Sequence, residues 1–307
     1  MPDDPSAFQL RKAIIEYCIL PLGSKSIKSN IQDHENVRSI LFYGPGGSGK
    51  TLMVKSIASE TGALLINLSS SNIGSSFGGK EGATKLIHMA FTVAKEKAYA
   101  PVIIHIDNCH EFFMGKAKRG GGSAVNAEMQ RFQKDLLVYK NQALKKEDQV
   151  LVIGCTNMPE SGDVKLLRWK GPSGKPEKQG FFERCLYFPR ASHADRAMMW
   201  KRLIRKRIYG FNKQAMAHEL DYAALAFLSD SFNAGEISST VNYVLSEDRV
   251  VNLASKPLSE HDFASYFVRE QTAQDDERFL SFTRQITSLD SVWKSINVTE
   301  KSGKNKK

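Results

Sequence analysis

The stretch Gly44-Pro-Gly-Gly-Ser-Gly-Lys50-Thr51 joins a short apolar run, residues 38–43, to a stretch of helical pattern, residues 50–61. It fits the pattern G-x-x-x-x-G-K-[ST], in which glycines let backbone N–H groups turn inward around phosphate oxygens. The helix that follows adds the positive end of its dipole at the same point. The pattern therefore predicts a phosphate-binding loop, with the lysine at the β- and γ-phosphates and the threonine hydroxyl on Mg²⁺. The predicted loop residues are Gly44, Pro45, Gly46, Gly47, Ser48, Gly49, Lys50, Thr51 and Leu52.

Further apolar runs of strand length alternate with helical patterns in the first part of the chain. The runs lie at 63–68, 101–106, 150–155 and 185–188, and the helical patterns between them lie at 79–98 and 125–144. Strands that are apolar throughout and alternate with helices indicate a parallel sheet covered on both faces. We therefore expect an α/β fold of the P-loop type, a parallel five-stranded sheet flanked by helices.

The chain changes character after residue 190, where only helical patterns follow. Because a single core stops growing efficiently at this length, we expect one large domain and a smaller, all-helical lid domain. The predicted divisions are an N-terminal helical segment and linker at 1–37, the α/β domain at 38–190, the helical lid at 191–270, and a C-terminal helix with a basic disordered tail at 271–307.

The composition describes an ordinary globular chain with an excess of positive charge. Of 307 residues, 41% are apolar and 25% charged, which excludes a disordered chain, a collagen-like chain and a disulfide scaffold. No apolar run approaches the roughly 18–20 residues of a membrane helix, and the N-terminus lacks the layout of a signal peptide, so we expect a cytoplasmic chain without a membrane partner. The four cysteines are far apart in sequence and predict reduced thiols rather than a zinc site. The net charge of +10 favours an acidic partner, and the lack of an interleaved aromatic-basic stripe makes nucleic acid the least favoured choice.

A carboxylate follows the third predicted strand, in Ile103-Ile104-His105-Ile106-Asp107. We expect Asp107 and Thr51 to hold Mg²⁺. Many ATPases place a glutamate directly after this aspartate to polarise the attacking water, but here the position is Asn108. An amide cannot accept the proton of that water, so the sequence predicts impaired hydrolysis; alternatively, Asn108 only caps the following turn. Glu111 lies four residues beyond Asp107, too far along the chain for us to expect it to substitute.

Two further positions fit a nucleotide site. Asn157 ends the fourth predicted strand and is expected to sense the γ-phosphate, although a polar residue there is also common turn chemistry. Ala234 and Gly235 open a predicted helix, and their small side chains would let the backbone approach a base or ribose. The alternative for Ala234 and Gly235 is an ordinary helix N-terminus.

The chain resembles AAA-type ATPases from about residue 20 to residue 267. The stretches that carry the resemblance are GPGGSGKT (44–51), IIHIDN (103–108), IGCTN (153–157), FFERCLYFP (181–189) and SFNAGEI (231–237). Three more resemble the ATPase module of the IQ-and-AAA-domain proteins, the axonemal subunit of the nexin–dynein regulatory complex, and these are YCILPLGS (17–24), SSSNIGSSFGGKEG (69–82) and the layout after KPLSEHDF (256–263). The resemblance implies ATP or ADP with Mg²⁺ as cofactors. It also implies a place in the axoneme of cilia and flagella, with the microtubule (tubulin) and regulatory-complex subunits as partners. The resemblance is compatible with either a single chain or an oligomer.

The arginine region departs from the family pattern. Active hexameric members place an arginine just before the F-[DE]-R stretch to reach the γ-phosphate of a neighbour, and here that position is Phe181. Arg184 could act in trans, unless the insertion at 170–180 displaces it, and Arg168 on the far side of that insertion is a second candidate. A surface ion pair is the alternative for both arginines. Phe77 falls where remodelling members present an aromatic residue to substrate in a central pore, or it packs as a loop anchor.

These observations support two hypotheses. In the first, ATP·Mg²⁺ binds between the α/β and helical domains and stabilises a structural module with degenerate catalytic motifs. In the second, the chain is an active, ring-forming ATPase that resembles the microtubule-severing AAA proteins. Asn108 and Phe181 favour the first hypothesis, while Asn157, Arg184 and Phe77 support the second.

Overall fold

The computed structural model describes residues 4–31, 36–73, 82–114, 132–145, 147–169, 180–211, 220–267 and 277–288. The contacts group these residues into two compact units. The sheet unit consists of the described residues of Phe8–Gly44, Lys50–Phe188 and Asp276–Lys307. The helical unit consists of the described residues of Pro189–Asp275 together with Met1–Ala7 and the loop tip Pro45–Gly49.

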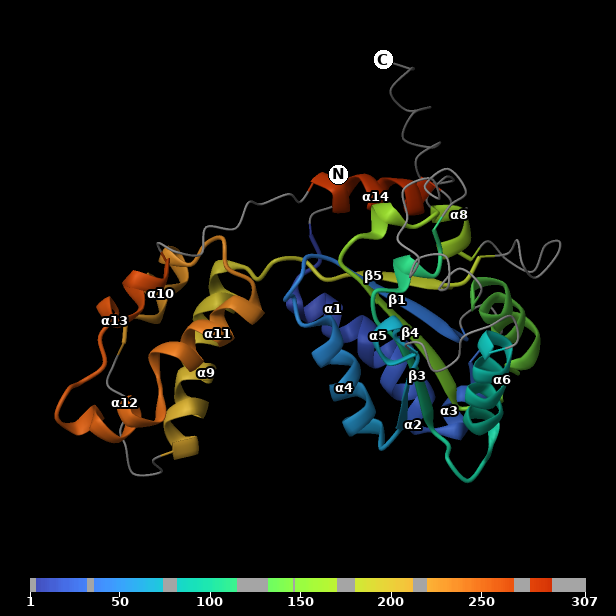
Figure 1. The fold of residues 1–307 in the computed structure, drawn as a ribbon, viewed down its shortest axis with the longest axis horizontal. Helices are drawn as coiled ribbons and strands as arrows, with labels where there is room; N and C mark the ends of the chain where they lie inside the picture. The colour runs from blue at the N-terminus through green and yellow to red at the C-terminus, as the bar shows by residue number, and fades with distance from the viewer. Residues whose placement is uncertain are drawn as a thin grey trace, which may run out of the picture. The chain divides into compact units, whose positions relative to one another are not determined.

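The sheet unit contains five parallel strands, as the alternating pattern predicted (Figure 1). Their order across the sheet is β2-β3-β4-β1-β5, and every neighbouring pair is parallel. Every residue of β1, β3 and β4 is buried, which explains why these runs lack polar alternation. The strands are β1 (Ser39–Tyr43), β2 (Leu64–Asn67), β3 (Val102–Ile106), β4 (Val150–Thr156) and β5 (Arg184–Tyr187).

One face of the sheet is covered by α4 and by the N-terminal helices (Figure 1). Cys18 and Leu22 from the N-terminal helices share a core with Phe42 of β1 and Ile57 of α4. Gln149 holds this layer by donating from Nε2 to the Leu22 carbonyl at 2.9 Å. The elements here are α1 (Ala7–Ile14), a π-helical turn (Ile15–Ile19), α2 (Leu20–Gly23), α3 (Lys25–Asn30) and α4 (Lys50–Thr61).

The opposite face is covered by α6 and α14 (Figure 1). Phe279, Phe282 and Ile286 of α14 are buried there, although this helix follows the whole helical region in sequence. The Tyr43 hydroxyl at the end of β1 lies 2.8 Å from Thr283 Oγ1, so α14 is hydrogen-bonded to the strand that precedes the loop. The elements on this side are α5 (Ser70–Ile73), α6 (Gly82–Lys95), helical residues 132–138 continued by a π-helical turn (Tyr139–Ala143), α8 (Val164–Leu167) and α14 (Glu277–Ser288).

The helical unit has its own core around Trp200, which is fully buried between Phe263 and Phe267. Its elements confirm the expected run of helices: α9 (His193–Phe211), α10 (Tyr222–Leu228), α11 (Ala234–Val244), α12 (Glu247–Val251) and α13 (His261–Phe267). No helix among the described residues is long and apolar enough to cross a membrane.

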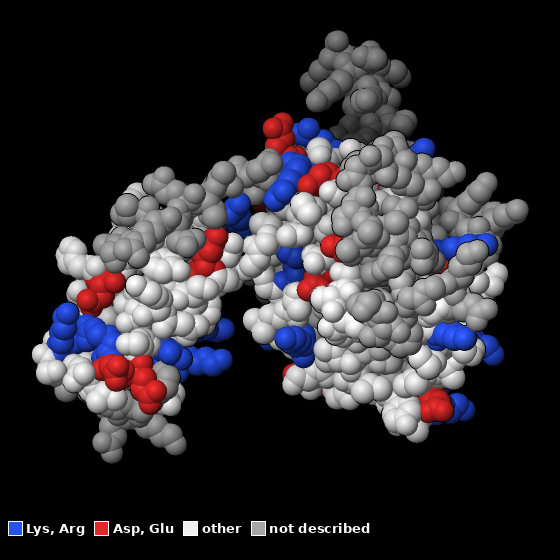
Figure 2. Space-filling model, viewed as in Figure 1, with Lys and Arg blue, Asp and Glu red and all other residues white. Residues whose placement is uncertain are grey.

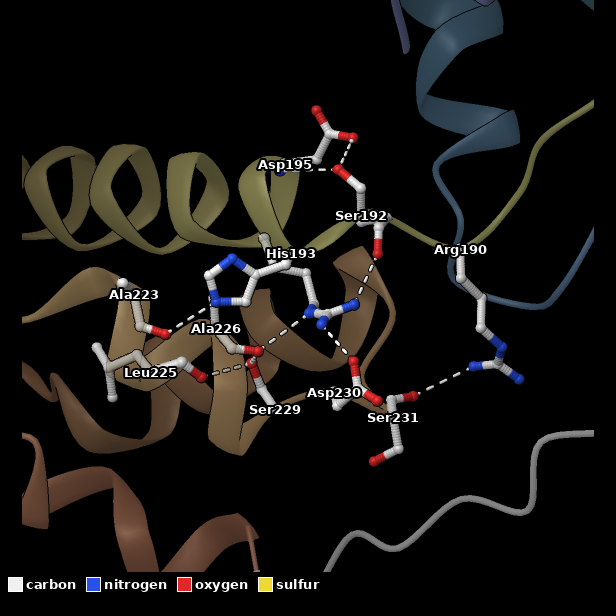
Figure 3. A network of polar contacts seen from close by, with 12 residues as sticks. Arg190, Ser192, His193, Asp195, Ala223, Leu225, Ala226, Ser229, Asp230 and Ser231 are labelled. Atoms are coloured by element: carbon white, nitrogen blue, oxygen red, sulfur yellow. Dashed lines mark hydrogen bonds and ion pairs between the residues drawn. The ribbon is translucent and has the colours of Figure 1, made fainter. Parts of the chain in front are cut away.

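A buried guanidinium joins the start of α9 to the end of α10 (Figure 3). Arg196 is 6% exposed and donates to the carbonyls of Ala226 at 3.1 Å and Ala191 at 2.7 Å, and it pairs with Asp230. Nearby, Trp200 donates from its indole nitrogen to Ser229 Oγ at 2.9 Å. Because Ala226 lies in the last turn of α10, the Arg196 guanidinium satisfies a carbonyl that the helix itself leaves unpaired.

A second buried ionic cluster lies where β5 begins. Glu183 accepts from Arg38 Nη2 at 2.9 Å and from Lys140 Nζ at 2.8 Å, and the Arg38 backbone N–H donates to its other oxygen at 2.6 Å. Burial lowers the pKa of Lys140 to about 8, against the opposing charge of Glu183. Burial alone would raise the pKa of Glu183, but Lys140 and Arg38 outweigh it and hold that pKa below its usual value.

We predict that Glu183→Gln destabilises the fold by about 3 kcal/mol at pH 7, because it leaves the Lys140 charge buried without a counter-charge. The folded-state pKa of Glu183 is lowered, so its contribution is complete above the unfolded pKa and is lost as pH falls through the folded pKa. The difference between wild type and variant should therefore shrink on acidification below about pH 4. Urea unfolding at several pH values measures it, with the exposed Glu60→Gln in α4 as the matched control. A pH-independent difference would show that charge pairing is not its origin.

We also predict that Phe282→Ala costs about 3–5 kcal/mol, because it opens a cavity under α14 beside Tyr43. The matched control is Phe227→Ala in α10, whose side chain is 75% exposed and should change stability by less than about 0.5 kcal/mol. Thermal unfolding followed by circular dichroism compares the two. Equal effects would mean that α14 does not contribute to the stability of the sheet unit.

Candidate functional site

The glycine-rich loop leaves β1 and enters α4, as predicted. Gly44 has φ +151° and Gly47 has φ +70°, a backbone region that side chains with a Cβ rarely adopt. A Cβ on Gly44 would also overlap the Phe188 carbonyl oxygen. The loop therefore depends on glycine at these points for both its torsion and its close packing.

Lys50, the first residue of α4, is only 8% exposed. Its Nζ donates to the Gly44 carbonyl at 2.9 Å, so the ammonium lies over the start of the same loop. Burial lowers the pKa of Lys50 to about 8, while Cys155 and Asp107 act in the opposite direction. A buried cation that is bound to the first carbonyl of a glycine-rich loop is suited to binding an anion.

Thr51 and Asp107 are brought together from two neighbouring layers. The Thr51 hydroxyl donates to Asp107 Oδ2 at 3.2 Å, across 56 residues of sequence. The backbone of Asp107 is held in turn, because its N–H donates to Ser69 Oγ at 2.8 Å. The two oxygens that the sequence predicted as metal ligands therefore lie at one point beside the loop.

Asn108 adopts a left-handed backbone conformation with φ +49° and ψ +41°. Asparagine tolerates this region better than most residues. Its side chain makes no capping hydrogen bond to the short 3₁₀ turn Cys109–Glu111, so the alternative role of side-chain cap does not apply. Asn108 is exposed next to Asp107, and Glu111 lies at the end of that turn, half-buried.

Asn157 directly follows β4, whose last residue Thr156 is paired with Tyr43 at the end of β1. Its Oδ1 is buried and has no hydrogen-bond partner among the described residues. Thr156 is held by His110, whose Nδ1 lies 2.9 Å from its Oγ1. A buried acceptor of this kind, at the edge where β1 ends, is suited to ordering a water or a donor of a ligand.

Two residues of this region were not singled out by the sequence. His105 and Cys155 are buried on β3 and β4, and each offers a ligand atom within 4.8 Å of the Asp107 carboxylate. Burial lowers the pKa of His105 and raises the pKa of Cys155. The signal in the sequence was one polar residue inside the apolar run PVIIHI, which alone does not reveal a neighbour on another strand.

The loop tip contacts the first turn of α11 within the helical unit. The Gly235 N–H donates to the Gly47 carbonyl at 3.0 Å. Asn233 and Glu236 form a capping box at the start of this helix, which places Ala234 and Gly235 at its first two positions. A Cβ on Gly235 would approach Gly47 Cα to 3.3 Å, so the small residue permits the contact.

The arginine region is ordered by the core rather than by exposed charges. Phe181 is fully buried, with its ring 5.1 Å from that of Phe113. Arg184 is the first residue of β5, in register with Ile40, and its guanidinium lies 5.6 Å from the centroid of the Tyr17 ring. Arg168 forms a parallel bridge to Phe182 and donates to the Glu183 carbonyl. Arg184 therefore keeps its register in β5, although it follows the segment 170–179 in sequence. Whether Arg184 acts on a neighbouring chain stays a prediction.

Phe77 and the basic tail, residues 301–307, lie outside the described residues. Leu52, in the first turn of α4, is 69% exposed. The predicted site residues thus divide into a group assembled at the ends of β1, β3 and β4, a group at the start of α11, and the arginines near the start of β5.

The sequence and the fold both match known proteins. Residues 40–171 match the family described as ATPase family associated with various cellular activities (AAA). Over 262 residues, 84% of this chain and 28% of the relative, the chain is 30% identical to dynein regulatory complex protein 11 of Mus musculus. It is 31% identical to 26S protease regulatory subunit 6A of Caenorhabditis elegans over 73% of this chain and 46% of that protein. It is 28% identical to Fidgetin-like protein 1 of Drosophila melanogaster, over 76% of this chain and 39% of that protein.

The chain spans less than half the length of each of these relatives. Among solved structures, it resembles the FIGL-1 AAA domain in complex with ADP, with a TM-score of 0.63, 20% identity and coverage of 90% of this chain and 87% of that one. At this identity the likeness shows the fold. Together with the glycine-rich loop, the five parallel strands and the helical unit, these matches show that the chain is an AAA module of the P-loop fold, related to the dynein regulatory complex protein.

Proposed function

We propose that this module binds ATP or ADP with Mg²⁺ and uses the nucleotide mainly as a structural ligand. The observation that carries the proposal is the Thr51–Asp107 contact beside Lys50 and the glycine-rich loop. Mg²⁺ holds its oxygen ligands at about 2.0–2.1 Å in an octahedron, so adjacent ligands lie about 3 Å apart. The 3.2 Å between Thr51 Oγ1 and Asp107 Oδ2 fits that spacing.

The remaining parts of a nucleotide site agree with this proposal. The buried, unpartnered Oδ1 of Asn157 among the described residues marks a position for a ligand or its water. The solved FIGL-1 AAA domain, which has the same fold, holds ADP. When bound, the nucleotide phosphates and Mg²⁺ would supply the charges that Lys50 and Asp107 are placed to neutralise. Lys50 binds the phosphates, Thr51 and Asp107 hold the cation, and Asn157 orders the γ-phosphate side.

Two features support weak or absent hydrolysis. Asn108 stands where a carboxylate would accept the proton of the attacking water, and an amide cannot do so. Phe181 stands where active hexameric members place an arginine, and it is fully buried among aromatic rings, where an unpaired charge would be costly. A missing arginine alone is worth roughly 10³–10⁵ in rate, so both changes together favour binding over turnover.

The proposed setting is a cytoskeletal assembly, the axoneme of cilia and flagella, because the chain is related to dynein regulatory complex protein 11. Its partners would be regulatory-complex subunits and the acidic surface of the microtubule. The net charge of +10 supports an acidic partner. Lysine and arginine side chains are exposed on both units on the face drawn in Figure 2, interspersed with acidic ones. On α9 the exposed basic residues are Arg202, Arg205 and Lys206.

The second candidate is an active, ring-forming ATPase that remodels or severs a protein or microtubule substrate. It is favoured by the 28–31% identity to a protease regulatory subunit and to a fidgetin-like protein. Arg184 would then have to leave the Tyr17 ring to act on a neighbouring chain. Nucleotide-dependent hexamers in light scattering would favour this candidate over the structural module.

We predict that Mg·ATP raises the unfolding temperature of the wild-type chain and not that of Lys50→Ala. At a nucleotide concentration of about 100 times Kd the stabilisation is about 2.7 kcal/mol, or roughly 5–10 °C for a chain of this size. The matched control is Lys55→Ala, an exposed lysine on the same helix, which should respond as the wild type does. An unfolding temperature that does not respond to ATP in the wild type would contradict nucleotide binding.

We predict steady-state phosphate release at or below roughly one turnover per hour, against a typical enzyme range of about 1–10³ s⁻¹.

Asn108→Glu should not restore activity, because the arginine is also missing. It should also lower stability by about 1 kcal/mol, because glutamate tolerates the left-handed backbone less well than asparagine. Asn108→Gly, which relieves the torsion, is the matched control for stability. Turnover near 1 s⁻¹ in the wild type that is abolished by Lys50→Ala would favour the active ATPase. If only the Asn108→Glu variant turned over at that rate, Asn108 would be the only catalytic defect.

A further inference from the structure

Three chemically distinct side chains converge at the carboxyl ends of β3 and β4. In the parallel register of β3 and β4, Ile106 lies opposite Gly154. The next residues along the two strands, Asp107 and Cys155, therefore lie side by side. Side chains two apart on a strand share a face, which places His105 on the same side as Asp107. One nitrogen of His105, the Cys155 Sγ and one Asp107 oxygen all lie within 4.8 Å of one another.

The nucleotide site leaves part of this cluster unused. His105 is 4% exposed, and its Nε2 is buried without a hydrogen-bond partner among the described residues. Cys155 is fully buried. An apolar side chain would fill the place of His105 without an orphaned nitrogen, as Ile104 and Ile106 do on either side of it. A buried imidazole lone pair beside a thiol and a carboxylate is the donor set of a metal site.

The geometry points to a binding site for a soft divalent cation such as Zn²⁺, with His105, Cys155 and Asp107 as the protein ligands and water in the fourth position. Zn²⁺ takes nitrogen and sulfur ligands at about 2.0–2.3 Å, whereas Mg²⁺ prefers oxygen. Side-chain rotation would shorten the distances between the three ligand atoms by about 1 Å, which brings them to the spacing that a bound ion requires. As the metal–sulfur bond forms, the S–H bond of Cys155 breaks and its proton leaves to solvent. The thiolate and the carboxylate then neutralise the two charges of the ion, which suits a buried site.

This site differs from the zinc sites that cysteine spacing reveals. Its ligands come from two strands, and only one of them is a cysteine. It needs no nucleotide, so it does not rest on the proposed function. One consequence does connect the two: Asp107 would serve both the soft cation and Mg·ATP, so the two ligands exclude each other. Zinc would then act as an inhibitor of nucleotide binding.

Titration of the nucleotide-free 307-residue chain with Co²⁺ tests the site, because cobalt replaces zinc and reports its ligands by absorption. We expect one Co²⁺ per chain, with a near-ultraviolet charge-transfer band from the Cys155 thiolate. The band should vanish in Cys155→Ala and persist in the matched control Cys185→Ala, whose half-buried thiol lies on β5 outside the cluster. His105→Leu should lower the cobalt affinity by more than about 10-fold, since even loss of a group that only supports a ligand costs about 10–100-fold. Thermal unfolding of each variant confirms that it is folded.

The outcomes separate this site from the nucleotide site. No band in the wild type, or a band that survives Cys155→Ala, overturns the proposal. If the cobalt affinity is unchanged in His105→Leu, the His105 imidazole is not a ligand, and the proposed site is likewise overturned. Loss of the band on addition of Mg·ATP supports the inference that Asp107 serves both ligands. A band that persists at saturating Mg·ATP overturns that inference. If the chain binds cobalt but its unfolding temperature does not respond to ATP, the metal site stands while the proposed function fails.

Discussion

The parallel alignment of β1, β3 and β4 is the constraint on which the rest of the structure depends. Parallel strands end at the same edge of a sheet, so residues 44, 107 and 157, which are far apart in sequence, meet at one place. β1 lies between β4 and β5, and this position brings Gly44 under the Phe188 backbone. The glycine-rich loop is therefore held by the sheet as well as by its own glycines.

Burial governs the charges of the sheet unit in two contrasting ways. Glu183 is surrounded by Arg38 and Lys140, so a buried carboxylate remains ionised and ties β5 to its neighbours. Lys50 is buried at the start of α4, and its ammonium donates to the Gly44 carbonyl at 2.9 Å. An ammonium that is bound to a backbone carbonyl can exchange that carbonyl for a phosphate oxygen. The first arrangement suits stability and the second suits binding.

The same edge of the sheet carries two kinds of ligand chemistry. Thr51 and Asp107 provide the oxygens that Mg²⁺ prefers, while His105 and Cys155 provide nitrogen and sulfur. Asp107 belongs to both sets, so the identity of the cation would decide whether nucleotide can bind. The proposed loss of a catalytic glutamate at position 108 is compatible with such a role, because binding rather than turnover would then be the property to be regulated.

The sequence by itself determined the strands, the loop and the helical region, because each rests on local patterns: apolar runs, the spacing of Gly44 and Lys50, and helical periodicity. It also singled out Asp107, Asn157 and Gly235 as candidates, since family motifs lie in fixed order along the chain, and their roles stay predictions. Only the tertiary structure decided that α14 returns to the sheet beside Tyr43, that Arg168 bridges to Phe182 across an insertion, and that His105 and Cys155 share a site with Asp107. These contacts join segments that are distant in sequence, and no local pattern records which strand lies next to which.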